Sequence, residues 1–129
     1  MMKTWKLMAF VATRDVARSA TFYRDKLGLT LIEDSPYALV FDANGTTLHV
    51  TPVRELKTAE YTVLGWDVPD INEAVGKLED AGIELKRYPG VMPQDDHGVW
   101  TAPGGGAKVA WFEDPDGNVL SVSQHYPAA

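Results

Sequence analysis

The order of predicted elements repeats once along the chain, and this repeat constrains the fold more than any other feature of the sequence. The first half opens with a strand-like run at 7–11, followed by a helix that Asp15 can cap and Gly28 can end. The inward stripe of this helix has helical spacing and consists of Val16, Ala20, Tyr23 and Leu27. Strand-like runs follow at 30–33, 37–42 and 46–52. The dipeptide Asn44-Gly45 is a hairpin signal between the last two.

The same order returns in the second half, with one residue fewer in the helix. A strand-like run at 62–68 leads to a helix that Asp70 can cap and Gly82 can end. Its inward stripe consists of Ile71, Ala74, Val75 and Leu78. A strand at 83–87, a loop and a hairpin complete this half.

Two β-α-β-β-β halves indicate a duplicated structural unit, because each half alone is too small to bury a good core. We therefore predict an α+β fold of two tandem βαβββ modules, about 5–55 and about 60–125, within one domain spanning residues 1–129. The two sheets are expected to lie side by side and present a concave mixed sheet to a ligand cavity. The helices are expected on the outer face.

The hairpin of the second half contains the segment WFEDPDGNVLSV, residues 111–122, in which acidic and amide side chains alternate as in a calcium loop. An EF-hand loop counted from Asp114 needs glycine at its sixth position and glutamate at its twelfth, where this chain has Val119 and His125. The calcium motif is therefore excluded. Pro115, Asp116 and Gly117 instead have the residue types of a tight turn between two strands.

Composition excludes several classes of protein. A net charge of −6 without a basic run argues against a nucleic-acid partner. The chain has no cysteine, which excludes disulfide frameworks and thiolate metal sites and fits the cytosol. No leader sequence and no segment of membrane-spanning length is recognised, so we predict a cytoplasmic protein without a membrane partner.

Two segments carry a resemblance to a known family. On paired β-α-β-β-β units, DVARSATFYRDKLGLTL (15–31) together with VAWFEDPDGNVLSV (109–122) resembles the vicinal oxygen chelate superfamily. This group holds glyoxalase I, extradiol dioxygenases, fosfomycin-resistance enzymes and bleomycin-binding proteins, and its members commonly pair. The resemblance covers nearly the whole chain, and it implies the fold rather than the chemistry, which has to be argued from the site.

The resemblance also implies where a metal would be held. Relatives that use a metal place one ligand on each of four strands, typically histidines and glutamates, and these positions fall here on Met8, His49, Val63 and Ser121. Only His49 binds a divalent ion well, since a thioether is a poor ligand for one and an isopropyl group is none. We therefore predict no metal and no cofactor. This argues against glyoxalase or dioxygenase activity, because both reactions depend on a metal to polarise substrate oxygens.

His49 is the best candidate for a catalytic residue, although a catalytic group is not identified by the sequence. If Leu48 and Val50 face the helix layer, then Thr47, His49 and Thr51 face the cavity, because strand side chains alternate. His49 then either orients a ligand or acts as a general base; a half-buried histidine bonded to a neighbouring hydroxyl is the structural alternative. Met8 and Phe10 would give the cavity an apolar floor.

The loop at 90–107 is long for so small a domain. Its Asp95, Asp96 and His97 could join a metal site, but a solvated loop is favoured because adjacent residues rarely converge on one ion. Trp100 is either a lid on an apolar pocket or a core residue. Trp66 and Trp111 are predicted to face the helices.

Two classes of function remain open. The first, which we favour, is a metal-independent small-molecule-binding protein of the glyoxalase/bleomycin resistance type. Its predicted ligand-binding residues are Met8, Phe10, Thr47, His49, Val63, Trp100 and Ser121. The second is a lyase or isomerase that uses His49 as base or a metal site rebuilt from other residues. We expect a homodimer in either case, because pairing covers strand edges that would otherwise promote aggregation.

Overall fold

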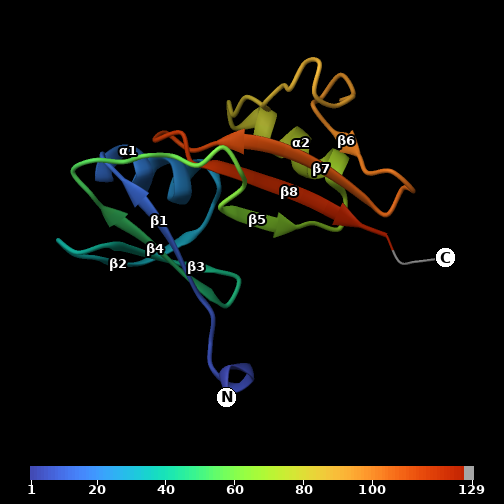
Figure 1. Cartoon of the computed structure of the whole chain (residues 1–129). Helices are drawn as coiled ribbons and strands as arrows, with labels where there is room; N and C mark the ends of the chain where they lie inside the picture. The colour runs from blue at the N-terminus through green and yellow to red at the C-terminus, as the bar shows by residue number, and fades with distance from the viewer. Residues whose placement is uncertain (127–129) are drawn as a thin grey trace. The chain divides into compact units, whose positions relative to one another are not determined.

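The computed structural model describes residues 1–126 and divides into two compact units, Met1–Thr58 and Ala59–Ala129 (Figure 1). Each unit contains one four-stranded mixed sheet and one helical segment packed on it. No helix within residues 1–126 is long and apolar enough to cross a bilayer. The α+β class and the two tandem βαβββ modules are confirmed.

The two units have the same element order and the same strand order. The first contains a short 3₁₀ turn η1 (Met2–Thr4), β1 (Met8–Thr13), α1 (Val16–Ala20), η2 (Thr21–Lys26), β2 (Thr30–Asp34), β3 (Leu39–Ala43) and β4 (Thr46–Pro52). The second contains β5 (Leu64–Asp67), α2 (Ile71–Asp80), β6 (Trp100–Thr101), β7 (Ala107–Glu113) and β8 (Val119–His125). The sheets are ordered β1-β4-β3-β2 and β5-β8-β7-β6, and in each the first strand runs parallel to the last strand of its unit. The chain is therefore duplicated in topology as well as in sequence pattern.

The helical segment of the first unit begins at the predicted cap and changes its winding. The Asp15 carboxylate accepts a hydrogen bond from the Arg18 amide, and the chain winds as α1 before it widens into the π-helical η2. This segment has one residue more than its counterpart in the second unit, and a π-turn accommodates such an insertion. Tyr23 is fully buried and packs 5.9 Å from the Phe41 ring on β3, which fixes the face of the sheet that the helix covers.

The predicted stripe of this first helix is only partly right. Tyr23 is buried as expected, but the other buried side chains are Ser19 and Phe22, whereas Val16, Ala20 and Leu27 are half-buried. Ser19 is buried because its hydroxyl donates to Thr13 Oγ1 at 2.7 Å, which satisfies both polar groups in the core.

Helix α2 follows its prediction closely. The Asp70 carboxylate accepts from the amides of Asn72 and Glu73. Beyond the last turn, Gly82 has φ +80 and the Ile83 amide donates to the Leu78 carbonyl, as in a Schellman ending. Three of the four predicted stripe residues are buried, namely Ile71, Val75 and Leu78, and Ala74 is half-buried.

Both predicted tight turns are present. Asn44 and Gly45 have φ values of 53 and 95 and join β3 to β4, whose bounds match the prediction. In the turn between β7 and β8, Asp114 is buried and its carboxylate accepts from the Asp116 and Asn118 amides at 2.9 Å. It also accepts from Asn118 Nδ2 at 2.8 Å. The carboxylate of Asp114 thus organises the turn.

One face of each sheet is covered by its helical segment, and we call the opposite face the open face. In β4, Leu48 and Val50 are almost fully buried under the helix, so Thr47, His49 and Thr51 lie on the open face as predicted. In β8, Gln124 lies on the covered face, because its side-chain oxygen accepts from the Ile71 amide of α2. Ser121 and Ser123 therefore lie on the open face of the second sheet.

Two predictions in the second unit are wrong. Trp111 pairs with Ser121 and so lies on the open face rather than under the helix; Trp66, paired with Val122, does lie on the covered face. The predicted strand at 83–87 is only a single bridge between Leu85 and Phe112, extended by a hydrogen bond from the Lys86 amide to the Trp111 carbonyl. This segment meets β7 at Leu85 and Lys86, and the chain then continues into the loop that follows.

Candidate functional site

The open face of the first sheet brings together four of the predicted ligand-binding residues. Strands β1 and β4 run side by side, and in their register Met8 lies opposite Thr47 and Phe10 opposite His49. Met8 and Phe10 are 47% and 61% exposed, although both are large and apolar. An exposed apolar patch beside polar groups is typical of a surface that binds a ligand or another chain.

The imidazole of His49 is held by stacking rather than by hydrogen bonding. The rings of Phe10 and His49 are 4.9 Å apart between centroids, with 28° between their planes. Within residues 1–126, His49 makes no hydrogen bond to a neighbouring hydroxyl, the contact that a purely structural histidine would use. Both ring nitrogens are therefore available to a ligand, as acceptor, donor or base.

The open face of the second sheet carries a group of three aromatic side chains, Tyr88, Trp100 and Trp111, which we call the aromatic cluster. The Trp100 and Trp111 rings are 6.1 Å apart, and Tyr88 meets Trp111 edge-on at 5.6 Å. The Trp111 indole N–H donates to Thr62 Oγ1 at 3.1 Å, which fixes the orientation of the ring. The cluster thus offers a fixed aromatic surface with a satisfied polar edge.

Ser121 lies directly beside the aromatic cluster. Val63 lies outside the strands of the second sheet. Ser121 is paired with Trp111 on β7 and with Gly65 on β5, and it is 7% exposed. Val63 precedes β5, is 39% exposed, and donates its amide hydrogen to the Val119 carbonyl. Each unit therefore contributes a separate group of predicted site residues.

The cluster was only partly foreseen from the sequence. Trp100 was singled out, but Tyr88, Thr62 and the position of Trp111 were missed. A signal for Trp111 was present, because the tight turn at Asp114–Asn118 sets a register that places residue 111 opposite residue 121.

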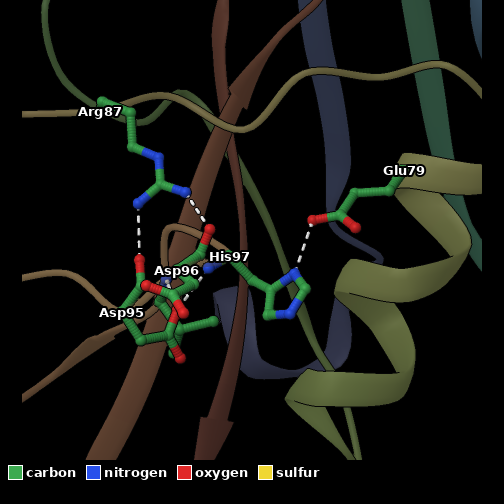
Figure 2. Close-up of polar contacts among 6 residues, drawn as sticks. Glu79, Arg87, Asp95, Asp96 and His97 are labelled. Atoms are coloured by element: carbon green, nitrogen blue, oxygen red, sulfur yellow. Dashed lines mark hydrogen bonds and ion pairs between the residues drawn. The ribbon is translucent and has the colours of Figure 1, made fainter.

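The acidic part of the long loop has a structural role (Figure 2). The Asp95 carboxylate accepts from the amides of His97 and Val99 at 2.9 Å. The Arg87 guanidinium donates to the backbone carbonyls of Asp95 and Asp96, and Figure 2 shows it reaching across both. These contacts fold the loop back on itself.

His97 links the same loop to helix α2. Its Nδ1 lies 3.0 Å from Glu79 Oε1, and Figure 2 shows the imidazole pointing toward that carboxylate. The hydrogen bond with Glu79 raises the pKa of His97 above the ordinary value of 6.5, and the charges of Glu79, Asp95 and Asp96 act in the same direction. His97 is thus a contact between loop and helix, and its charge depends on pH.

The residues at the four positions where relatives hold a metal do not fit one. They supply a thioether, an imidazole, an isopropyl group and a hydroxyl, of which only the imidazole of His49 is a good ligand for a divalent ion. Met8 and His49 belong to the first unit, and Val63 and Ser121 to the second. In the described range 1–126, no three His, Asp or Glu side chains gather as a metal site would require.

Comparisons with known proteins agree with this fold. A family model described as the Glyoxalase/Bleomycin resistance protein/Dioxygenase superfamily matches residues 7–122. A lactoylglutathione lyase from Agrobacterium tumefaciens has a TM-score of 0.71 and 18% identity, covering 93% of each chain. The fosfomycin resistance protein FosX from Listeria monocytogenes has a TM-score of 0.73 and 12% identity, covering 93% of this chain and 92% of that one.

A third similar structure is TioX from Micromonospora sp. ML1, with a TM-score of 0.69 and 19% identity, covering 94% of this chain and 98% of that one. No curated protein matches the chain by sequence. At these identities the likeness to the solved structures extends to the fold alone.

Proposed function

We propose that this chain, which belongs to the Glyoxalase/Bleomycin resistance protein/Dioxygenase superfamily, binds a small molecule without using a metal. The ligand would meet the open faces of the sheets, at Met8, Phe10, Thr47 and His49 in the first unit. The second unit offers a separate candidate surface at Val63, Ser121 and the aromatic cluster. Each surface is proposed by itself.

The observation that carries the proposal is the Phe10–His49 stack on a sheet face that the helix leaves uncovered. Exposing a phenyl ring costs free energy in water, at roughly 25 cal/mol per Å² of apolar surface, and a ligand that covers the ring recovers this cost. A stacked pair also presents a flat surface with hydrogen-bonding atoms at its edge. That combination suits a planar organic molecule with polar substituents.

The composition of the four positions argues against metal-assisted chemistry. Glyoxalase-type reactions depend on a metal to polarise substrate oxygens, and a single imidazole does not hold one. We therefore propose that the chain lacks the lactoylglutathione lyase activity of its Agrobacterium relative. Metal analysis of the purified protein tests this point.

A second candidate function is an enzyme that uses His49 as a general base. The observation in its favour is that the ring nitrogens of His49 make no hydrogen bond within residues 1–126, so a substrate proton could reach one of them. A metal site rebuilt from Asp95, Asp96 and His97 has less support, because Asp95 and His97 already hold the loop in shape.

We further propose that the protein is a homodimer. The strands β1, β2, β5 and β6 are the outermost strands of their own sheets, and large apolar side chains such as Trp5, Leu7 and Phe10 are exposed in the first unit. A second copy would cover part of this surface.

A thermal-shift screen tests the proposal. Planar aromatic compounds with polar substituents are added to the protein in buffer containing EDTA, since a true ligand raises the melting temperature by mass action. We expect some compounds to raise it in proportion to the logarithm of their concentration. The shift should shrink in His49→Ala for a ligand of the first unit, or in Trp111→Leu for a ligand of the second, and persist in Asp96→Ala. Shifts of equal size in all four proteins would place binding elsewhere.

A further inference from the structure

Gly65 and Ser121 lie opposite each other on the parallel strands β5 and β8, on the open face of the second sheet. A Cβ atom added at Gly65 would lie 2.9 Å from Ser121 Oγ, a distance that real Cβ atoms essentially never show. The hydroxyl therefore leans over Gly65 and occupies space that any other side chain at this position would take. Removing this glycine would displace the hydroxyl.

The Ser121 hydroxyl has no hydrogen-bond partner among residues 1–126, although the residue is 93% buried, the complement of its 7% exposure. No side-chain polar atom in that range is both sealed from solvent and unpaired. Its oxygen therefore still reaches solvent. A hydroxyl placed in this way is hydrogen-bonded by water, which the polar group of a ligand can replace.

Gly65 itself has no backbone reason to be glycine. Its φ is not in the left-handed region, unlike that of Gly28, Gly45 or Gly82, so other residues could adopt its conformation. Glycine in a strand interior weakens the strand, and it often marks a place where a ligand approaches the backbone closely. The close approach of the Ser121 hydroxyl is the remaining reason for its presence.

We propose that the Ser121 hydroxyl, where it leans over Gly65, is a polar subsite that receives a neutral hydrogen-bonding group of an aromatic ligand. Ser121 Oγ is the partner of that group, and the Trp111 ring, opposite Ser121 on β7, is the adjacent surface for the aromatic part. The inference rests on the proposed function, because it assumes that a small molecule binds on this open face. It adds the chemical class of the ligand and identifies Gly65 as a specificity-determining residue.

The next pair of residues on the open face limits the charge of the ligand's hydrogen-bonding group. Asp67 lies two residues beyond Gly65 on β5, on the same face and opposite Ser123. Residues two apart on a strand are about 6.5–7 Å apart, so an exposed carboxylate there disfavours an anionic substituent. The Ser123 hydroxyl is already bonded to His125 Nε2 at 3.0 Å. The ligand group that best matches the Ser121 hydroxyl is therefore a neutral hydroxyl.

Three naphthalene probes of similar shape test the subsite: 2-naphthol, 2-methylnaphthalene and 2-naphthoate. Binding to the isotope-labelled protein is followed by amide and indole NMR shifts, which give an affinity and locate the probe at Trp111 and Ser121. We expect 2-naphthol to bind about fivefold tighter than 2-methylnaphthalene, as one hydrogen bond implies. The anionic 2-naphthoate should bind more weakly than 2-naphthol.

Variants separate the subsite from the aromatic surface. In Gly65→Ala and Ser121→Ala the preference for 2-naphthol over 2-methylnaphthalene should fall to about onefold, while the affinity for 2-methylnaphthalene stays unchanged. Gly76→Ala, a glycine of helix α2 with open space around it, and Ser123→Ala, on the same face, should keep the preference. Melting temperatures confirm that each variant is folded.

The outcomes separate a failure of the proposed subsite from a failure of the proposed small-molecule binding. Equal binding of 2-naphthol and 2-methylnaphthalene by the unmodified protein, or a preference that survives in both Gly65→Ala and Ser121→Ala, would overturn the subsite alone. If no probe shifts the Trp111 indole signal, the aromatic surface does not bind, and the proposed function on this face fails together with the subsite.

Discussion

Phe10 on β1 and His49 on β4 lie opposite each other in a parallel register, with their rings stacked at 4.9 Å between centroids. This relationship joins the one good metal ligand of the four implied positions to an apolar ring, and within residues 1–126 it leaves both imidazole nitrogens without a hydrogen bond. Our proposal is that a ligand binds here by contact with the rings and by hydrogen bonding to the imidazole.

Replacement of His49 by alanine should leave the fold nearly intact. His49 lies on the open face and supports little of the core, so the free energy of unfolding in urea should fall by less than about 1 kcal/mol. Phe41→Ala is the matched control, because Phe41 is fully buried and its truncation should cost about 3–5 kcal/mol. Ligand affinity should fall about three- to tenfold in His49→Ala. A loss of stability comparable to that of Phe41→Ala would make His49 a structural residue.

Replacement of Asp114 by alanine should destabilise the second unit strongly. The buried carboxylate accepts hydrogen bonds from two backbone amides and from the Asn118 side chain, and these donors would be left without it. We expect a loss of about 2–4 kcal/mol in urea unfolding. Glu84→Ala, an exposed carboxylate in a loop, should change stability by less than about 0.5 kcal/mol. Equal effects of the two substitutions would contradict the structural role of Asp114.

The duplicated order, the strand at Thr46–Pro52 and both helix caps could be predicted from the sequence. Asp15, Asp70 and the Asn44-Gly45 turn have residue types whose local chemistry allows few conformations, and neighbouring contacts do not change that chemistry. The open-face position of His49 followed in the same way from the alternation of Leu48 and Val50.

The face of Trp111 could not be read from its own strand. Val109, Ala110, Trp111 and Phe112 form a continuous apolar run, so their pattern carries no period of two. The register of the β7–β8 hairpin decides the face, and it depends on the hydrogen bonds of the turn. The segment at 83–87 was mispredicted for a related reason, because its composition suits a strand but it meets β7 at Leu85 and Lys86 without forming a ladder.

The pair of His97 and Glu79 should make stability depend on pH. The pKa of His97 is raised in the folded protein, so its contribution is fully present below the ordinary value of 6.5 and is lost as the pH rises through the raised pKa. In Glu79→Gln the pKa of His97 measured by NMR should return toward that ordinary value. The difference in melting temperature between the two proteins should then disappear on going from mildly acidic to alkaline pH. A difference that grows with rising pH would have the wrong sign for this pair.

The homodimer can be tested by sedimentation. We expect the protein to sediment as a dimer at high micromolar concentration, because a second copy would cover exposed strand edges and apolar side chains. Replacing exposed Trp5 and Leu7 by serine should shift the equilibrium toward monomer while the melting curve remains cooperative. A monomer across the whole concentration range would contradict the proposal.

Metal independence of ligand binding is the central claim, and a titration tests it most directly. A compound from the thermal-shift screen is titrated into protein that has been dialysed against EDTA, and again after addition of one equivalent of Zn²⁺, Ni²⁺ or Mn²⁺. We expect the same dissociation constant in all samples, because only His49 among the four implied positions is a good ligand for these ions. Binding that vanishes after EDTA treatment and returns with one of the ions would contradict the account and place the protein among the metal-dependent members of its family.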